Sequence, residues 1–390
     1  MLPGIGIFGT GNIVRVLVTF LREKGFKIIS IWGRTKEEAE RVATDMDIPF
    51  YTSKVDDVVL RKDIDLIFIF CAPKLHVEIT VKALGLGKHV VCDKPGGLSQ
   101  IDVFKMGKAA LYYPTLITII NHSLRFLPTF VNLKREIKDG LLDGKISVID
   151  IRVQIGPILA DGQCYNWLCD ARMGGGVLTL VGSHIIDLIT YLTNRKAFKV
   201  HALIRNFSTT TNLHKNGSIR SVSSPDFCSF QMELDGGILV TATLSSYPNA
   251  IANQEITIFG PNGRLTVRST DLFCCTGQQE EIRLLDTEKK QEPILTNEIF
   301  ISGPYVQGLR NMIGALREAF EPVEDKSGWT KEPVSKAATF EDGVYVQSVI
   351  EALILSNSNR EWTKVEQIAD LPDPNSVLSS AAVRSTTISL

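Results

Sequence analysis

The chain has 390 residues, a formal net charge of −1 at pH 7, 44% hydrophobic and 22% charged residues. This composition is typical of a globular protein long enough for two domains, and it gives no electrostatic reason to expect a nucleic acid or an anionic membrane as a partner. No apolar run reaches the roughly 20 residues of a membrane span, and the seven scattered cysteines indicate reduced thiols rather than a zinc site.

The N-terminal region from Ile5 to Arg34 predicts a strand, a glycine turn, a helix and a second strand. The apolar first strand leads into Gly9-Thr10-Gly11, and apolar residues at helical spacing follow from Ile13. Glycines at this turn let a pyrophosphate approach the backbone, and the helix N-terminus offers N–H groups to the phosphates. Val14 replaces the third glycine of the usual pattern, so a plain connecting turn is the alternative.

The end of the second strand bears on the choice of nucleotide. NAD sites usually have Asp or Glu there for the ribose 2′-hydroxyl, whereas this chain has Gly33-Arg34-Thr35. A cation and a hydroxyl suit a 2′-phosphate, so we predict NADP, with NAD as the other possibility. The alternative for Arg34 is a solvated charge that opens the next helix.

Strands then alternate with helices as far as residue 121. Helical spacing covers 35–46, 77–86 and 101–113, and apolar strands cover 65–70, 89–92 and 116–120. Such alternation predicts a parallel, doubly wound sheet, so residues 1–121 are predicted to form a Rossmann dinucleotide-binding domain. A signal peptide at the N-terminus would remove the first strand, so we expect a cytoplasmic protein, with export by a non-classical route as the alternative.

After residue 121 the pattern changes to alternating apolar residues. A helix at 128–140 is followed by strands from 146, and the further strands are expected at 227–234, 238–244, 255–259 and 263–267. These predict an α+β domain with a large, mainly antiparallel open sheet over residues 122–365. Helices are expected at 178–192, 305–320 and 335–356, a surface loop at 210–224, and a loosely held tail at 366–390.

Two strand ends of the first domain have chemically useful side chains. Ala72-Pro73 and His76 follow the strand at 65–70, where a nicotinamide ribose would pass, although His76 could belong to a plain helix face. Asp93-Lys94-Pro95 follows the strand at 89–92. Lys94 can hydrogen-bond the reacting oxygen of a substrate and stabilise charge as hydride moves. An ordinary surface lysine is the alternative.

A third cluster lies in the second domain. Gly174-Gly175-Gly176 precedes a predicted helix that contains His184 and Asp187. A histidine ordinarily titrates near neutral pH, so we expect His184 to accept a hydroxyl proton. Asp187 lies on nearly the same helix face and can orient it. A core histidine on an amphipathic helix is the plainer alternative.

Taken together, these motifs resemble the Gfo/Idh/MocA family of NAD(P)-dependent oxidoreductases. The order of five separated motifs gives this resemblance, which covers nearly the whole chain: Gly9-Thr10-Gly11, Ala72-Pro73 with His76, Gly87 to Pro95, Arg125-Phe126 with Pro128, and the glycine run leading to His184 and Asp187. Segments at 1–4, 32–35, 49–53, 165–170 and 226–228 are also similar to the animal glucose-fructose oxidoreductase domain-containing proteins.

The resemblance implies a Rossmann domain followed by an α/β domain whose open sheet forms a homodimer. It also implies hydride transfer at a carbinol carbon of a small sugar, polyol or diol, with Lys94 and His184 as catalytic residues and no metal. The expected cofactor contacts are Gly9, Thr10, Gly11, Asn12, Ile13, Arg34, Thr35, Ala72, Pro73, His76, Asp93 and Lys94, and the expected substrate contacts are Lys94, Arg125, Trp167 and His184.

Two residues depart from the family pattern. Asp93 shortens the carboxylate of the family's E-K-P, and Leu180 stands where the family has an aspartate four residues before its histidine. The loss of that acid–base partner predicts altered substrate choice, slow turnover or none. A second hypothesis is therefore a dinucleotide-binding protein without catalysis, acting as a redox sensor or an assembly partner. A cofactor held tightly and recycled within one catalytic cycle is a third.

Overall fold

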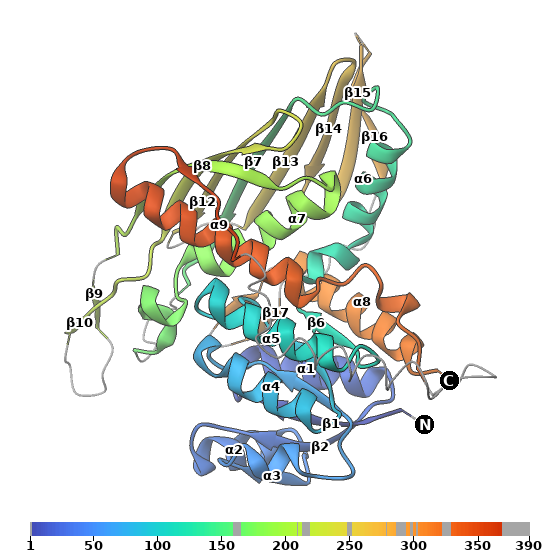
Figure 1. The fold of residues 1–390 in the computed structure, drawn as a ribbon, viewed down its shortest axis with the longest axis vertical. Helices are drawn as coiled ribbons and strands as arrows, with labels where there is room; N and C mark the ends of the chain where they lie inside the picture. Colours follow the sequence, from blue (N-terminus) through green and yellow to red (C-terminus); the bar gives the residue numbers. More distant parts are fainter. Residues whose placement is uncertain are drawn as a thin grey trace, which may run out of the picture.

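In the computed structural model, a Rossmann domain and a domain with a large sheet lie one above the other (Figure 1). The structure describes residues 2–158, 165–208, 210–212, 219–247, 252–277, 279–285, 294–296, 299–301, 303–321 and 329–368. This arrangement confirms the predicted fold class, because a parallel sheet is followed by a mainly antiparallel one.

The first sheet is parallel and doubly wound, with the strand order β3-β2-β1-β4-β5-β6. Its central strands are continuous apolar runs because helices cover both faces. The short edge strand β3 was not predicted, since three residues show no periodicity. The strands are β1 (Gly4–Phe8), β2 (Lys27–Trp32), β3 (Phe50–Thr52), β4 (Leu66–Ile69), β5 (His89–Cys92) and β6 (Thr118–Ile120), and the helices are α1 (Asn12–Glu23), α2 (Lys36–Asp45), α3 (Asp56–Val59), α4 (His76–Gly85) and α5 (Gln100–Tyr112).

The second sheet has nine strands in the order β16-β15-β14-β13-β7-β12-β11-β8-β19. All neighbouring pairs are antiparallel except β7 with β12. The strands are β7 (Val148–Ile155), β8 (Ala197–Arg205), β11 (Phe227–Leu234), β12 (Ile238–Ser246), β13 (Asn253–Gly260), β14 (Gly263–Arg268), β15 (Asp271–Thr276), β16 (Ile282–Leu285) and β19 (Thr363–Lys364).

One face of this sheet is covered by helices and the other is open. Helices α6 (Pro128–Lys138), α7 (Ser183–Thr193) and part of α9 (Phe340–Asn359) share a core with the covered face. On the open face, Leu203 and Phe259 remain 42% and 38% exposed. The open sheet expected from the resemblance is therefore present.

Several predicted boundaries shift in the structure. The expected loop at 210–224 contains a hairpin of β9 (Thr210–Asn212) and β10 (Ile219–Ser221), and a second hairpin joins β17 (Ile294–Thr296) to β18 (Ile299–Ile301). The helix expected from 335 begins at Phe340, because Thr339 and Asp342 form a capping box there. Most of the tail predicted at 366–390 lies outside the described residues.

The segment Ala171–Thr193 is long and apolar enough to cross a membrane by length and composition. However, 83% of its most apolar window is buried inside the protein. Its apolar character is explained by its place in the core, where α7 contacts the large sheet.

The chain returns to the Rossmann domain near its C-terminus. Helix α8 (Gly303–Ala319) shares a core with α1 and β1, through side chains such as Leu309 and Ile313 packed with Leu17. In Figure 1, α8 lies beside the first domain. The sequence-based division assigned this helix to the second domain, but its packing belongs to the first.

Gly308 is required where α8 passes the 3-10 turn η2 (Ser123–Phe126), because a Cβ at this position would collide with the Ser123 carbonyl. We therefore expect Gly308→Ala to lower the free energy of unfolding by about 1–3 kcal/mol, as overpacking does. Gly314→Ala in the same helix is the control, since its Cβ would come no closer than 3.7 Å to Lys24, and it should be neutral or stabilise by up to about 1 kcal/mol. Urea denaturation measures both; equal effects would contradict the packing described here.

Candidate active site

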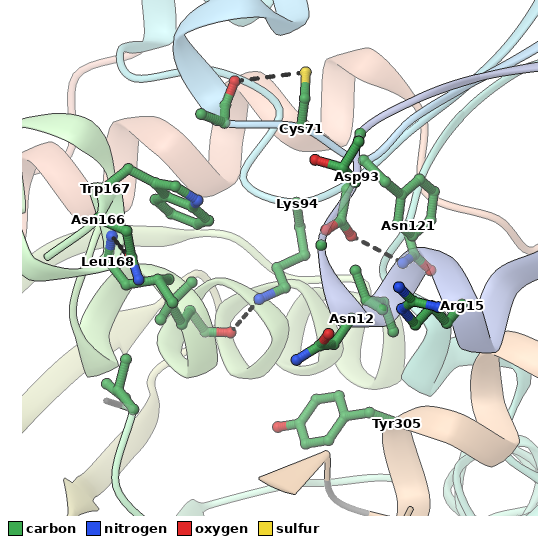
Figure 2. A pocket seen from close by; sticks show the side chains of 18 of the residues that line it. Asn12, Arg15, Cys71, Asp93, Lys94, Asn121, Asn166, Trp167, Leu168 and Tyr305 are labelled. Atoms are coloured by element: carbon green, nitrogen blue, oxygen red, sulfur yellow. Dashed lines mark hydrogen bonds between the residues drawn. The ribbon is translucent and has the colours of Figure 1, made fainter. Parts of the chain in front are cut away.

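A cavity of about 940 Å³ lies at the carboxyl ends of the Rossmann strands. One end is lined by the glycine turn after β1 and by residues that follow β2. The other end is lined by the region around Trp167, the turn that leads into α7, and α8. Figure 2 shows side chains from these separate segments around one space. This position is where doubly wound sheets bind their ligands.

The glycine turn leaves open space at the head of α1. Gly9 has a φ of +138°, and a Cβ there would collide with the Phe70 carbonyl, so the turn depends on glycine. A Cβ on Gly11, by contrast, would have no described protein atom within 4 Å. Val14, which replaces the third glycine of the pattern, is completely buried in the core behind the turn. The departure at Val14 therefore leaves the cradle open, and a dinucleotide phosphate fits there.

The end of β2 supplies charged groups to the same end of the cavity. Arg34 lines the cavity with its side chain 81% exposed, and it pairs with Glu38 at 3.2 Å. Arg41 lines the cavity beside them. Thr35 does not line it, because its hydroxyl accepts a hydrogen bond from the Glu38 amide and caps α2. Thr35, expected to contact the cofactor, therefore has a structural role at the start of α2.

The segment after β4 is only partly in the cavity. Ala72 lines it, whereas Pro73 is buried at the start of a 3-10 turn outside the lining. His76 is also outside and fully buried, with its ring nitrogens 3.0 Å from the Pro95 carbonyl and 2.9 Å from the Cys71 carbonyl. His76, expected to contact the cofactor, instead lies outside the cavity lining, where its imidazole ties the two strand-end loops together.

Lys94 is half-buried in the cavity wall and bonded across the two domains. Its Nζ donates to the Leu180 carbonyl at 2.8 Å (Figure 2). Leu180 lies in a π-helical turn, Leu178–Gly182, a feature frequent at functional sites. Burial lowers the pKa of the Lys94 amine. The preceding Asp93 accepts a hydrogen bond from the Asn121 amide at 2.9 Å.

His184 lines the same end of the cavity and is only 4% exposed. Its ring lies between those of His122 and Tyr305, at centroid distances of 5.3 and 4.7 Å. Burial, and then the charge of Lys94, lower the pKa of His184 well below its usual value. Its Nδ1 has no hydrogen-bond partner in the described part of the chain. The imidazole is therefore neutral near pH 7 and able to accept a proton.

Arg125 and Asp187 bind each other behind the cavity wall. The Arg125 guanidinium binds Asp187 in a bidentate pair, with distances of 2.8 Å from Nε and 2.6 Å from NH2, and both side chains are buried. Asp342 lies 3.4 Å from the same guanidinium. Arg125, expected to contact substrate, lies outside the cavity lining, and both carboxylate oxygens of Asp187 are bonded to it rather than to His184.

The cavity is also lined by Tyr305, Asn121, Asn166 and Leu168, which the sequence pattern did not reveal as site residues. Tyr305 lines the cavity, and its hydroxyl is buried with no hydrogen-bond partner among the described residues. Burial raises its pKa. A single tyrosine at the start of a distant helix gives no local signal, so only the packing of α8 could reveal it. This one cavity brings together most of the expected contacts: Gly9, Thr10, Gly11, Asn12, Ile13, Arg34, Ala72, Asp93, Lys94, Trp167 and His184.

Comparisons with known proteins agree with this architecture. Residues 4–114 match the family described as "Oxidoreductase family, NAD-binding Rossmann fold", and residues 130–266 match the GFO/IDH/MocA C-terminal domain. The chain is 43% identical over 380 residues to glucose-fructose oxidoreductase domain-containing protein 2 of Xenopus tropicalis, covering 97% of each chain.

Solved structures with low sequence identity share the fold. Levoglucosan dehydrogenase in complex with NADH and levoglucosan superposes with a TM-score of 0.77 at 18% identity, covering 94% of this chain and 100% of the other. A super-repressor mutant of Gal80p from Saccharomyces cerevisiae has a TM-score of 0.74 at 17% identity, covering 94% of this chain and 98% of the other.

The open space over Gly11 allows a direct test of the cradle. Gly11→Ala adds a methyl group that meets no described protein atom, so the thermal midpoint should stay within about 2 °C of wild type. The methyl would occupy the position of a bound phosphate, so we expect the Kd for NADPH to rise at least about 10-fold, or about 1.4 kcal/mol. Calorimetric titration gives the affinity.

Gly85→Ala is the matched control for this variant. Gly85 lies in α4 outside the cavity lining, and its Cβ would likewise meet nothing within 4 Å. It should leave the NADPH affinity unchanged and keep the thermal midpoint unchanged or raise it by up to about 2–4 °C, as expected for Gly→Ala in a helix. An unaltered Kd in Gly11→Ala would show that the nucleotide does not lie over the head of α1.

Proposed function

The chain belongs to the Gfo/Idh/MocA oxidoreductase family, and from this premise we propose that it transfers hydride between NADP and a carbinol or carbonyl carbon of a small sugar, polyol or diol. One observation carries the proposal. Lys94 and His184, which come from different domains, line the same end of a cavity whose other end is an open glycine cradle.

The two residues have complementary roles in this proposal. A bound nicotinamide would accept the carbinol hydrogen with its electron pair, which leaves a carbonyl group on the substrate. The hydroxyl proton passes to His184, whose lowered pKa keeps the imidazole unprotonated and its ring nitrogen free to accept a proton. Lys94 donates to the reacting oxygen. An ammonium group has three donors, so the bond to the Leu180 carbonyl leaves others for substrate.

NADP is favoured over NAD by the charges at the end of β2. No carboxylate occupies positions 33–35, and both Arg34 and Arg41 line the cavity there. An exposed guanidinium can form charge-assisted bonds to a 2′-phosphate. Glu38, which pairs with Arg34, is the group that would favour NAD if it turned toward a ribose hydroxyl.

We also propose that two copies of the chain associate through the open face of the large sheet. Half-exposed apolar side chains, including Leu203 and Phe259, support this proposal. An open sheet face with exposed apolar side chains is a surface that a second copy of the chain could cover.

A binding protein without catalysis is the second candidate. Two observations favour it: Leu180 has no acid–base group, and its carbonyl already engages Lys94. The fold is also that of a super-repressor mutant of Gal80p, a protein whose name describes no reaction. In this alternative the chain would act as a redox sensor or an assembly partner that responds to the bound dinucleotide.

The cofactor preference can be tested with Arg34→Ala. Loss of a charge-assisted contact should raise the Kd for NADPH about 10-fold and leave the Kd for NADH unchanged, since only NADPH has the 2′-phosphate. Fluorescence titration with both reduced cofactors measures the difference. Wild-type protein that binds NADH as tightly as NADPH would refute the assignment and point to Glu38 instead.

The catalytic assignment can be tested with Lys94→Met and His184→Ala. Loss of a general acid–base group costs about 10²–10⁴ in rate, so each variant should lose turnover by that order while the Kd for NADPH stays within about threefold. Turnover is followed by cofactor absorbance over a panel of sugars, polyols and diols. Lys74→Met, at an exposed lysine outside the cavity lining, is the control and should keep full activity.

The same experiment distinguishes the two candidate functions. Tight NADPH binding by wild-type protein, with no oxidation or reduction across the panel, would favour the binding protein. Unchanged turnover in both variants would instead remove Lys94 and His184 from the mechanism.

A further inference from the structure

We propose that His122 is the acid–base partner of His184: the two imidazoles form one proton-sharing pair, into which the substrate hydroxyl gives its proton. This inference rests on the proposed hydride transfer and adds a residue to its proton path. His122 lies in the short segment between β6 and η2 and belongs to none of the motifs in the sequence. A core histidine that only fills space is the alternative.

His122 lies directly behind the reacting end of the cavity. Its neighbours Asn121 and Ser123 both line the cavity, whereas His122 is outside the lining and only 2% exposed. The ring centroids of His122 and His184 are 5.3 Å apart, and the two rings are nearly perpendicular, at 84°. His184 therefore faces the cavity and contacts a second imidazole behind it.

Both imidazoles have a buried nitrogen without a partner. The Nδ1 atoms of His122 and His184 form no hydrogen bond to any described residue. A buried polar atom left unsatisfied is costly, so a residue that only filled space here would better be apolar. A catalytic role is one of the reasons for which native structures keep such atoms. Rings this close can exchange a proton through one bridging water molecule.

The charges around His122 partly offset the cost of protonating it. Burial lowers the pKa of the His122 imidazole, and Asp187 in α7 opposes burial by raising this pKa. Arg125 and Lys94 lower the pKa further, whereas Asp342 in α9 raises it. Two carboxylates from different helices therefore stabilise a positive charge on His122.

The surroundings of His184 favour its neutral form more strongly. Burial lowers the pKa of His184 well below its usual value, and the charges of Lys94 and of a protonated His122 lower it further. A proton taken from the substrate is therefore more stable on His122 than on His184.

Two other neighbours of His184 cannot take this part. Leu180, four residues earlier in the chain, has no acid–base group. The Tyr305 ring lies 4.7 Å from that of His184, but burial raises the pKa of the Tyr305 hydroxyl, which stays protonated. Among the described ring contacts of His184, His122 is thus the neutral base.

The proton path follows from these charges. The carbinol hydrogen leaves with its electron pair to the bound nicotinamide, and the hydroxyl proton goes to a ring nitrogen of His184. His184 then gives a proton to His122 and is neutral again. After the product leaves, the proton returns through His184 to water in the cavity, so both imidazoles are neutral for the next turnover.

The test follows both imidazoles by ¹⁵N NMR of histidine-labelled, full-length protein while the pH is lowered from 8. In wild-type protein the signals of His122 and His184 should move with one midpoint, because interacting groups titrate as a pair. In His122→Gln the His184 signal should stay that of a neutral ring at this midpoint, down to at least about 10-fold more acid. The control is His201→Gln in β8, outside the cavity lining, which should keep the joint midpoint.

Turnover gives an independent measurement. His122→Gln should lower kcat at pH 7 by about 10-fold or more, as loss of an acid–base group does, with KM and the Kd for NADPH within about threefold. The acid limb of kcat for alcohol oxidation should move to lower pH, because a proton on His122 no longer blocks the path. A histidine that only fills space would not move this limb. His122→Phe, which keeps a flat ring, replaces His122→Gln if the latter does not fold.

Each outcome decides the inference separately from the proposed function. Joint titration that is lost in the variant, without turnover of any compound, would support the histidine pair and overturn the proposed hydride transfer. An unchanged kcat together with an unchanged His184 midpoint would overturn the inference and leave hydride transfer established. Separate midpoints for the two signals in wild-type protein, or no change in either before the protein unfolds, would overturn it even if neither variant folds.

Discussion

A buried ion pair between Arg125 and Asp187 fixes the geometry on which the candidate site depends. Arg125 lies in η2, shortly after the last Rossmann strand, and Asp187 lies in α7, one turn beyond His184. Asp342, at the start of α9, adds a third contact to the same guanidinium. Removing one partner of a buried pair typically costs about 3–5 kcal/mol, since the other charge is left uncompensated. The pair therefore holds the helix that contains His184 against the domain that contains Lys94.

The return of the chain in α8 and α9 adds a second constraint. Helix α8 packs against α1, which begins at the glycine cradle, and the same helix supplies Tyr305 and Leu309 to the reacting end. Helix α9 contacts the Rossmann domain with Phe340 and the large sheet with Val349. Both ends of the cavity are thus built on shared cores, and the distance between cradle and reacting end is set by close-packed helices rather than by loops.

The bond from Lys94 to the Leu180 carbonyl connects a candidate catalytic residue with the residue that stands in place of the family's aspartate. A backbone acceptor keeps the lysine in place whatever side chain occupies position 180, so the side chain is free to vary without loss of the lysine's orientation. Leucine at this position turns one cavity wall apolar while Lys94, His184 and Tyr305 remain together. The site therefore has Lys94 and His184, as the family pattern does, and an apolar side chain at position 180, where the family has an aspartate.

The sequence alone determined the two sheets, the glycine cradle, and the positions of Lys94 at a strand end and of His184 in a helix. These features are local, because apolar periodicity and strand-end positions follow directly from which residues are buried. Tertiary structure alone decided the roles of His76, Arg125 and Asp187, and brought in Tyr305. The Arg125–Asp187 pair joins residues 62 apart in the chain, and the Lys94–Leu180 bond joins residues 86 apart. No local pattern encodes such partners, since they meet only when packed helices and strands bring distant backbone segments together.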